Sequence, residues 1–213
     1  MSSDPGLRYA IPSRIYTVEE VIKRSRFITT AAHAPDADAA NAFVDSVREL
    51  LPDATHHCWA FIAGPPGSTA HIGMSDDGEP HGTAGRPMLS VLLHSEVGEI
   101  VTVCARYFGG VKLGTGGLSR AYAGGVKLLL QTLPTESKIK RVRITVRVAY
   151  PHVENLQRLL EDLEALVEHE DYGEEVRYQI AVPATTLETL REQLAQLTSG
   201  EGVLEQTVRR ALL

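Results

Sequence analysis

Cysteine is scarce in this sequence, and the two cysteines, Cys58 and Cys104, each lie in an apolar, strand-like run. Such a pair does not form the framework of a disulfide-stabilised secreted domain, and it is typical of a reducing compartment. Long apolar runs are also lacking, because no segment approaches the roughly 20 residues that span a bilayer. The N-terminal residues contain no basic segment followed by an apolar one. We therefore expect no secretion signal and no membrane partner, and a cytoplasmic location.

An excess of positive charge is lacking as well. The chain has 21 lysines and arginines against 27 aspartates and glutamates, which gives a net charge of -6. A nucleic-acid-binding surface would therefore have to be a local patch. The length of 213 residues is sufficient for one large domain or two small ones.

The first part of the chain, residues 1–137, predicts an α+β domain. Residues 1–14 are polar and contain proline and glycine, so we expect a loose arm there. Asp36 and Thr83 each precede an apolar pattern with helical spacing, and both are predicted to be N-caps. The expected strands cover residues 25–32, 55–63, 70–74 and 99–108, and the expected helices cover 36–51, 83–93 and 118–133.

The second part, residues 138–213, predicts a smaller domain. Basic and apolar residues alternate over residues 138–150, which is typical of a half-buried strand. A helix over 153–167, strands over 167–172 and 175–182, a helix over 187–197 and a strand over 203–212 follow. This β-α-β-β-α-β order is the ferredoxin-like pattern.

Two glycine-rich segments between Ser75 and Tyr122 are the strongest candidates for a site. The second segment follows a strand, opens a helix and combines cations with aromatic residues. That mixture suits phosphate contacts and base stacking, although a tightly packed turn would explain the glycines equally well. The candidate RNA- or anion-binding residues are Arg106, Tyr107, Gly109, Gly110, Lys112, Gly114, Gly116, Gly117, Arg120 and Tyr122.

The first segment is acidic and offers an alternative, catalytic site. Its carboxylates could hold a divalent cation, but they would also complement the positive end of the helix that begins there. Together with the histidines and the thiol on the strand at 55–63, they could form the site of a small-molecule or peptide hydrolase. The residues of this alternative are His56, His57, Cys58, Asp76, Asp77 and Glu79. We assign no metal and no cofactor to the chain.

Several ordered motifs resemble the YigZ/IMPACT family over roughly residues 15–130. They are Ser25-Arg26-Phe27-Ile28, His56-His57-Cys58-Trp59-Ala60, Ser75-Asp76-Asp77-Gly78-Glu79-Pro80, Gly82-Thr83-Ala84-Gly85 and the stretch from Arg106 to Leu118. The resemblance implies an N-terminal domain similar to domain 2 of ribosomal protein S5 and a C-terminal ferredoxin-like domain. Eukaryotic relatives are translational regulators. Their regulatory pathway does not carry over to a bacterial member, for which the two fold likenesses imply a role linked to RNA or the ribosome. We therefore expect a binding protein linked to translation, with RNA or a ribosome-associated protein as partner, in preference to an enzyme.

Overall fold

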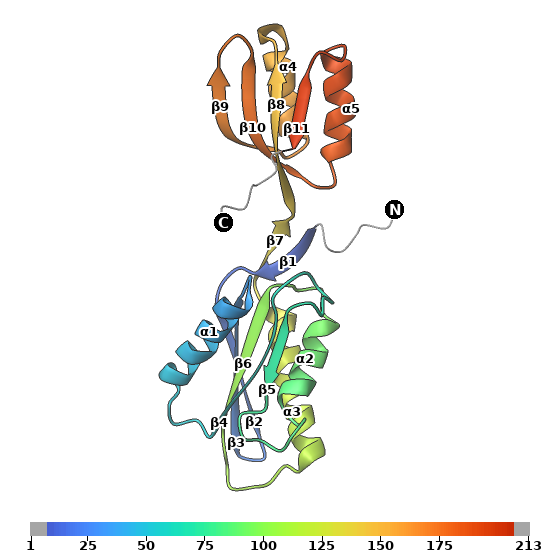
Figure 1. The fold of residues 1–213 in the computed structure, drawn as a ribbon. Coiled ribbons are helices and arrows are strands. Elements are labelled where there is room, and N and C mark those ends of the chain that lie inside the picture. The colour runs from blue at the N-terminus through green and yellow to red at the C-terminus, as the bar shows by residue number, and fades with distance from the viewer. Residues whose placement is uncertain (1–7, 207–213) are drawn as a thin grey trace. The chain divides into compact units, whose positions relative to one another are not determined.

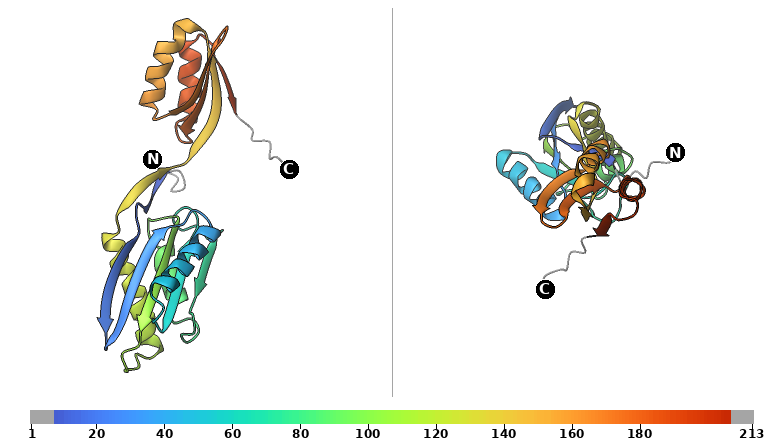
Figure 2. Two further views of the ribbon diagram at one scale, coloured as in Figure 1. Left: turned by 90° about the vertical axis from the view of Figure 1, so that its left-hand side faces the viewer. Right: turned by 90° about the horizontal axis from the view of Figure 1, so that it is seen from above.

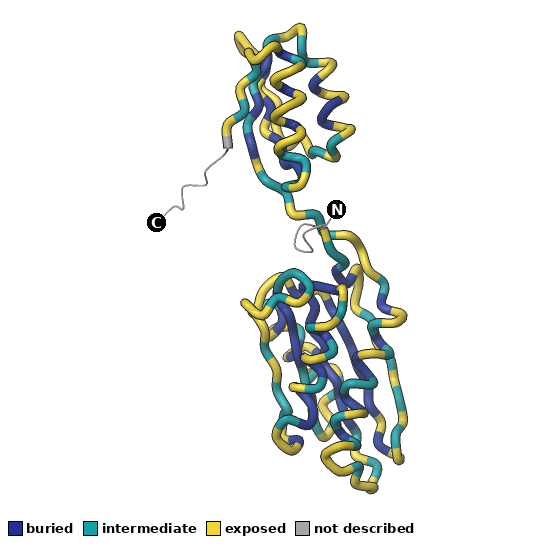
Figure 3. The backbone as a smooth tube through the Cα atoms, turned by 90° about the vertical axis from the view of Figure 1, so that its right-hand side faces the viewer, coloured by how far each residue is buried: buried dark blue, intermediate teal, exposed yellow. Residues whose placement is uncertain are grey.

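The computed structural model describes residues 8–206, which fall into two compact units (Figure 1). The first unit ends at Lys138 and the second begins at Ile139. Both units combine strands with helices, which confirms the α+β class expected from the sequence. Each unit also has its own hydrophobic core, and Figure 3 shows the buried residues concentrated in the central strands.

A five-stranded antiparallel sheet forms the centre of the first unit, with the strand order β2-β3-β6-β4-β5. The middle strand, β6, is buried along nearly its whole length. This burial agrees with its continuous apolar sequence, since a strand covered on both faces needs no polar face. The strands are β2 (Tyr16–Ile22), β3 (Ser25–His33), β4 (His56–Ile62), β5 (Ile72–Ser75) and β6 (Ile100–Tyr107).

Helices cover both faces of this sheet (Figure 2). Helix α1 (Ala37–Leu50) packs on the face that carries Val101 and Val103, and the predicted cap Asp36 accepts a hydrogen bond from the Ala39 N–H at 2.8 Å. Helices α2 (Gly85–Leu93) and α3 (Thr115–Thr132) pack on the opposite face, which carries Cys58 and Cys104. The alternation of side chains along β4 and β6 thus supplies both cores.

A buried carboxylate attaches a second, two-stranded sheet to the first unit. Strand β1 (Arg8–Pro12) pairs with β7 (Thr135–Ile139). The Tyr9 hydroxyl donates to Glu99 at 2.7 Å, and the Lys138 ammonium contacts both Glu99 oxygens at 2.6 and 2.7 Å. Burial alone would raise the pKa of Glu99, but the bonds from Lys138, His33 and Tyr9 hold that pKa below its usual value. The expected loose arm is therefore wrong for residues 8–12.

The second unit is a four-stranded antiparallel sheet with two helices on one face. Its strand order is β11-β8-β10-β9, and the elements follow one another as β-α-β-β-α-β. The core lies between the helices and the inward-facing side of β8 and β10. The elements are β8 (Arg141–Val148), α4 (Val153–Asp162), β9 (Leu166–Tyr172), β10 (Val176–Pro183), α5 (Leu187–Leu197) and β11 (Val203–Gln206), with a short 3-10 turn η1 (Tyr150–His152) before α4.

Some sequence predictions fail at the ends of elements. Thr83 is not the cap of α2: the N-cap is Ala84, and the Thr83 hydroxyl donates to the Pro80 carbonyl at 2.6 Å. The strand expected over 138–150 is divided between β7 and β8, and the helix expected over 153–167 ends at Asp162. Strand β2 was not predicted. The last part of the strand expected over 203–212 lies outside the described residues.

Candidate functional site

The two glycine-rich segments meet at one end of the five-stranded sheet, and Glu79 joins them. Glu79 lies in the acidic loop between β5 and α2 and is only 8% exposed. Its carboxylate accepts hydrogen bonds from the Arg106 guanidinium at 2.5 Å and from the Tyr122 hydroxyl at 2.8 Å. Arg106 lies near the end of β6 and Tyr122 lies on α3, so this one carboxylate ties the acidic loop to both elements that flank the basic loop.

Burial changes the roles open to Arg106 and Tyr122, two of the candidate RNA contacts. Arg106 is 5% exposed and Tyr122 is completely buried. The Tyr122 ring packs edge-on against Phe27, with ring centroids 5.4 Å apart, and so presents no face on which a base could stack. Burial also raises the pKa of Tyr122, which keeps its hydroxyl a hydrogen-bond donor to Glu79. Both residues hold the site together instead of lining its surface.

Asp76 supplies the anion that the N-terminus of α2 needs. Its two carboxylate oxygens accept hydrogen bonds from the backbone N–H groups of Gly82, Ala84 and Gly85, at 2.7, 3.0 and 2.9 Å. Burial alone would raise the pKa of Asp76, but these three bonds outweigh burial and hold the pKa below its usual value. The expectation that the acidic loop complements a helix start therefore describes Asp76 well.

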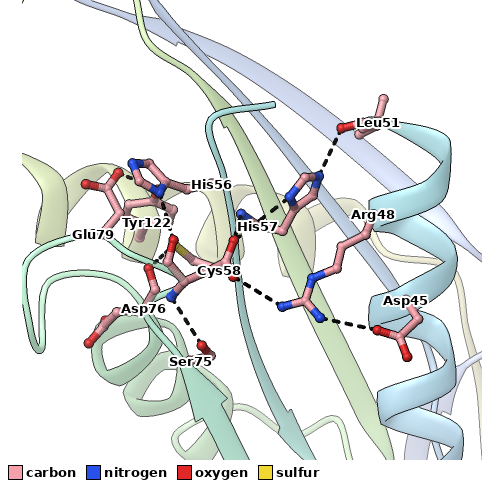
Figure 4. Close-up of polar contacts among 11 residues, drawn as sticks. Asp45, Arg48, Leu51, His56, His57, Cys58, Ser75, Asp76, Glu79 and Tyr122 are labelled. Carbon is pink, nitrogen blue, oxygen red and sulfur yellow. Dashed lines mark hydrogen bonds and ion pairs between the residues drawn. The ribbon is translucent and has the colours of Figure 1, made fainter. Parts of the chain in front are cut away.

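Asp77 brings the acidic loop against the histidine strand, and Figure 4 shows Asp76 of the same loop beside Cys58 of that strand. The Asp77 carboxylate accepts the His57 backbone N–H at 2.6 Å, lies 3.9 Å from the His57 Nδ1 atom, and contacts Arg48 of α1 at 3.2 Å. The His56 ring donates from Nδ1 to the Asp77 carbonyl at 2.7 Å, and His57 donates from Nε2 to the Leu51 carbonyl at 3.0 Å. The residues of the catalytic alternative do converge, but these bonds occupy several of their polar atoms.

Cys58 is poorly placed to act as a nucleophile. Its side chain is buried, and its thiol donates to the Asp76 carbonyl at 3.0 Å. Burial raises the pKa of Cys58 far above that of a free thiol, so little thiolate forms at neutral pH. Burial also raises the pKa of its cross-strand neighbour Cys104, to about 12. Within residues 8–206, no three histidine, cysteine or acidic side chains are grouped so that they could hold a metal ion.

The basic loop between β6 and α3 is held by close backbone contacts. A Cβ atom on Gly109 would lie 2.0 Å from the Arg24 carbonyl, and the Gly109 N–H donates to the Ser25 hydroxyl at 3.2 Å. Gly110 and Gly114 have φ values of 82° and 74°, which other residues rarely adopt. Gly116 and Gly117 lie in the first turn of α3. The glycines thus serve the fold of the loop, and the loop then exposes Lys112.

The exposed cations gather around the start of α3. Lys112 and Arg120 are exposed, whereas Tyr107 is half-buried beneath the Arg26 guanidinium, 5.3 Å from its ring. Lys23 and Arg120 line a small pocket of about 190 Å³ together with Leu113 and Gly117. Helix α3 itself begins at Thr115, and its N-cap residue, Gly114, provides no side-chain cap; its first turn contains no acidic residue. This end of the helix therefore offers backbone N–H groups and positive charge to an anion.

The hairpin tip Lys23-Arg24 is a part of this surface that we did not anticipate from the sequence. The two residues join β2 to β3, both are exposed, and their φ values are 47° and 69°. A two-residue hairpin of this geometry favours Asn-Gly, so a Lys-Arg pair there carries a conformational cost. The sequence indicates this hairpin tip only when the alternation of residues 16–22 is interpreted as a strand.

Comparison with known proteins places the chain among close relatives. Residues 23–130 match the family model described as the Impact N-terminal domain, and residues 146–201 match a domain of unknown function, DUF1949. The chain is 44% identical to the IMPACT family member YigZ of Escherichia coli K12, over 90% of this chain and 94% of that protein. An IMPACT family member of Haemophilus influenzae is 38% identical, over 92% of this chain and 96% of that protein.

A solved structure supports the same relationship. It is described as the crystal structure of an hypothetical protein, and it is 42% identical to this chain. The match covers 95% of this chain and 98% of that one, with a TM-score of 0.68. No helix within residues 8–206 combines the length and the apolar character needed to cross a membrane.

Replacing Glu79 by leucine should destabilise the first unit by about 3–5 kcal/mol, because Arg106 would remain as a buried, unpaired charge. The double variant Glu79→Leu/Arg106→Leu should be more stable than the single one, since neither charge is left. Trp59 is the single tryptophan of the chain and lies in β4, so its fluorescence during urea unfolding reports on the first unit. A loss below about 1 kcal/mol for Glu79→Leu would contradict the central role of this carboxylate.

The hydrogen bonds to Asp76 should make stability depend on acid pH. Because the pKa of folded Asp76 is lowered, its contribution is present above the unfolded value and is lost as the pH falls through the folded value. The Asp76→Asn variant should therefore lose less stability than the natural chain between about pH 5 and pH 2. The exposed Asp53→Asn variant serves as the control, and parallel unfolding curves for Asp76→Asn and the natural chain would refute this role.

Proposed function

The chain belongs to the IMPACT family, and on that premise we propose that it is a binding protein linked to the regulation of translation. RNA is the ligand that the surface favours, and the contact is made through the basic glycine-rich loop. The observation that carries this function is the group of exposed cations around the uncapped start of α3. The protein works in the cytoplasm, with residues 1–137 and 138–213 as its two domains.

Local charge supports this assignment in a chain whose net charge is negative. Residues 100–135 contain no aspartate or glutamate, and neither does α2. Lys112, Arg120 and Lys127 are exposed and belong to this segment, which contains no carboxylate of its own. RNA phosphates gain from such a patch because they release condensed counterions when they bind to it.

The two helix starts of this end of the domain differ in a way that also favours an external anion. The N-terminus of α2 is already occupied by the carboxylate of Asp76. The N-terminus of α3 receives no side-chain cap and lies beside Lys112. A phosphate group would supply at α3 the negative charge that Asp76 supplies at α2.

Two proposed likenesses between folds support this function. We propose that the first unit is similar to domain 2 of ribosomal protein S5. The β-α-β-β-α-β order of the second unit supports a ferredoxin-like domain. Both are analogies at the level of the fold, and the cation patch is the independent support.

Binding to single-stranded RNA should weaken in the Lys112→Ala/Arg120→Ala variant. Each phosphate contact contributes about 0.7 to the slope of log affinity against log salt, so the loss of two contacts should flatten that slope by about 1.4. Fluorescence anisotropy with a labelled RNA over a salt series measures both quantities. The Arg14→Ala/Lys140→Ala variant removes the same charges at other exposed positions and should retain the natural slope. No binding at low salt, or equal slopes in the two variants, would contradict RNA binding at this loop.

The convergence of Asp77 with His57 favours one alternative function, that of a small-molecule or peptide hydrolase. A general base must lie within hydrogen-bond reach of its partner, and the 3.9 Å between the Asp77 carboxylate and His57 Nδ1 exceeds that reach, so this alternative requires the two side chains to move closer when substrate binds. A thiol mechanism at Cys58 has less support, because its pKa is raised and its thiol is buried.

Thiol labelling tests the nucleophile directly. Cys58 and Cys104 should both resist iodoacetamide in the folded protein at about pH 8, because burial suppresses thiolate formation and access. Both should react once the chain is unfolded in denaturant, which serves as the internal control. Mass spectrometry counts the modified thiols, and rapid labelling of Cys58 in the folded protein would revive the thiol mechanism.

A further inference from the structure

The free edge of the second sheet has an unusual surface. Strand β9 is the last strand in the order β11-β8-β10-β9, so one of its edges pairs with no other strand of the described chain. Figure 1 shows this strand at the outer side of the sheet. Every one of its seven residues is exposed, including the large apolar residues Leu166, Val167 and Tyr172 at 54%, 43% and 58%. An uncovered edge of this kind can accept an added strand.

The helices leave the inward-facing side of β9 uncovered. Val167 and Tyr172 lie opposite Ile180 and Val176 in the register with β10, so they share the face that carries the core of this unit. Ile180 and Val176 are completely buried, whereas Val167 and Tyr172 are not. Glu170 lies opposite the buried Tyr178 and so shares this face, and its carboxylate accepts a hydrogen bond from the Tyr172 hydroxyl at 2.6 Å. The core therefore continues outward to β9 as an exposed strip of apolar side chains with one carboxylate among them. A further strand beside β9 could place its own apolar side chains along that strip.

The negative charge around β9 indicates which kind of partner could bind there. Residues 161–175 contain eight acidic residues and no lysine or arginine. Two arginines of neighbouring strands offset part of this charge, because Arg143 pairs with Glu168 at 2.9 Å and Arg177 lies opposite Asp171. Two copies of β9 placed edge to edge would bring these carboxylates together, which disfavours self-pairing. RNA would meet the same repulsion. The eight residues are Glu161, Asp162, Glu164, Glu168, Glu170, Asp171, Glu174 and Glu175.

We propose that β9 is a docking edge for an extended, lysine- or arginine-bearing segment of a partner protein, which adds to the sheet as a fifth strand. Main-chain hydrogen bonds to the free edge supply the affinity. On the face that carries Val167, Glu170 and Tyr172, apolar side chains of the segment pack beside Val167 and Tyr172, and a cation lies near Glu170. On the opposite face, a second cation of the segment lies near Asp171. This surface is independent of the basic loop of the first unit, so one chain can engage RNA and a basic protein segment through different domains.

A synthetic peptide of about eight residues that alternates lysine and valine provides the probe, since its length matches β9. Binding to the full chain is followed by fluorescence anisotropy. Two modified peptides carry N-methyl groups on alternate residues. One is methylated at its odd-numbered residues and the other at its even-numbered residues. Strand addition uses the N–H groups of only one edge of the peptide, so one methylated peptide should lose binding and the other should keep it. If charge alone attracted the peptide, the two methylated peptides would bind with equal affinity.

Paired charge reversals locate the contact. The Glu170→Lys/Asp171→Lys variant should weaken the unmodified peptide by about tenfold, because cross-strand attraction becomes repulsion. The Glu192→Lys/Glu201→Lys variant makes the same change in net charge at exposed positions of the same unit and should bind the peptide normally. Hydrogen exchange should show new protection in β9 when the peptide is bound.

Three results would overturn the docking edge. Equal binding of both methylated peptides would show that no strand is added. Equal weakening in the two charge-reversal variants would show a diffuse electrostatic attraction. Self-association of the chain through β9, seen as protection of β9 that rises with protein concentration, would assign the edge to a second copy. Loss of RNA binding in the basic-loop variants has no bearing on any of these readouts.

Discussion

The buried ion pair between Glu79 and Arg106 is the constraint on which the arrangement of the site depends. An unpaired charge at either position would be costly, so the acidic loop must lie where Glu79 can reach both Arg106 and Tyr122. That position in turn places Asp76 at the start of α2 and Asp77 against the histidine strand. The residues with the most suggestive chemistry are therefore largely occupied with one another, whereas Lys112 and Arg120 beside them remain exposed.

Much of the fold follows from the sequence because the relevant signals are local. The spacing of apolar residues after Asp36 and over residues 187–197 defines α1 and α5, and the apolar run of β6 marks it as a central strand. The sequence predictions fail where contacts between residues far apart in the chain determine the local structure. Residues 8–12 form a strand because they pair with the distant β7, and Tyr9 also reaches Glu99. Helix α2 has no cap of its own side chains, and Asp76 of the preceding loop accepts its first N–H groups.

The candidate site shows the same division between local and distant information. The sequence correctly indicates that the region from Ser75 to Tyr122 contains interacting charged groups. It does not reveal that Arg106 and Tyr122 face inward, because burial is decided by packing against Phe27 and Glu79. Nor does it show that Lys23, at the tip of a hairpin far back in the chain, shares a pocket with Arg120. The exposed cations around the start of α3 belong to the first unit, and the acidic edge at β9 belongs to the second.

The left-handed turn at Lys23-Arg24 has a consequence for protein engineering. Standard stabilising redesign would replace this pair by Asn-Gly, which suits the backbone better. The same change would remove two positive charges from the end of the domain where they are concentrated. A library selected for thermal tolerance alone would thus drift toward a tighter hairpin and a less basic surface. Selection at this turn therefore has to monitor surface charge as well as melting temperature.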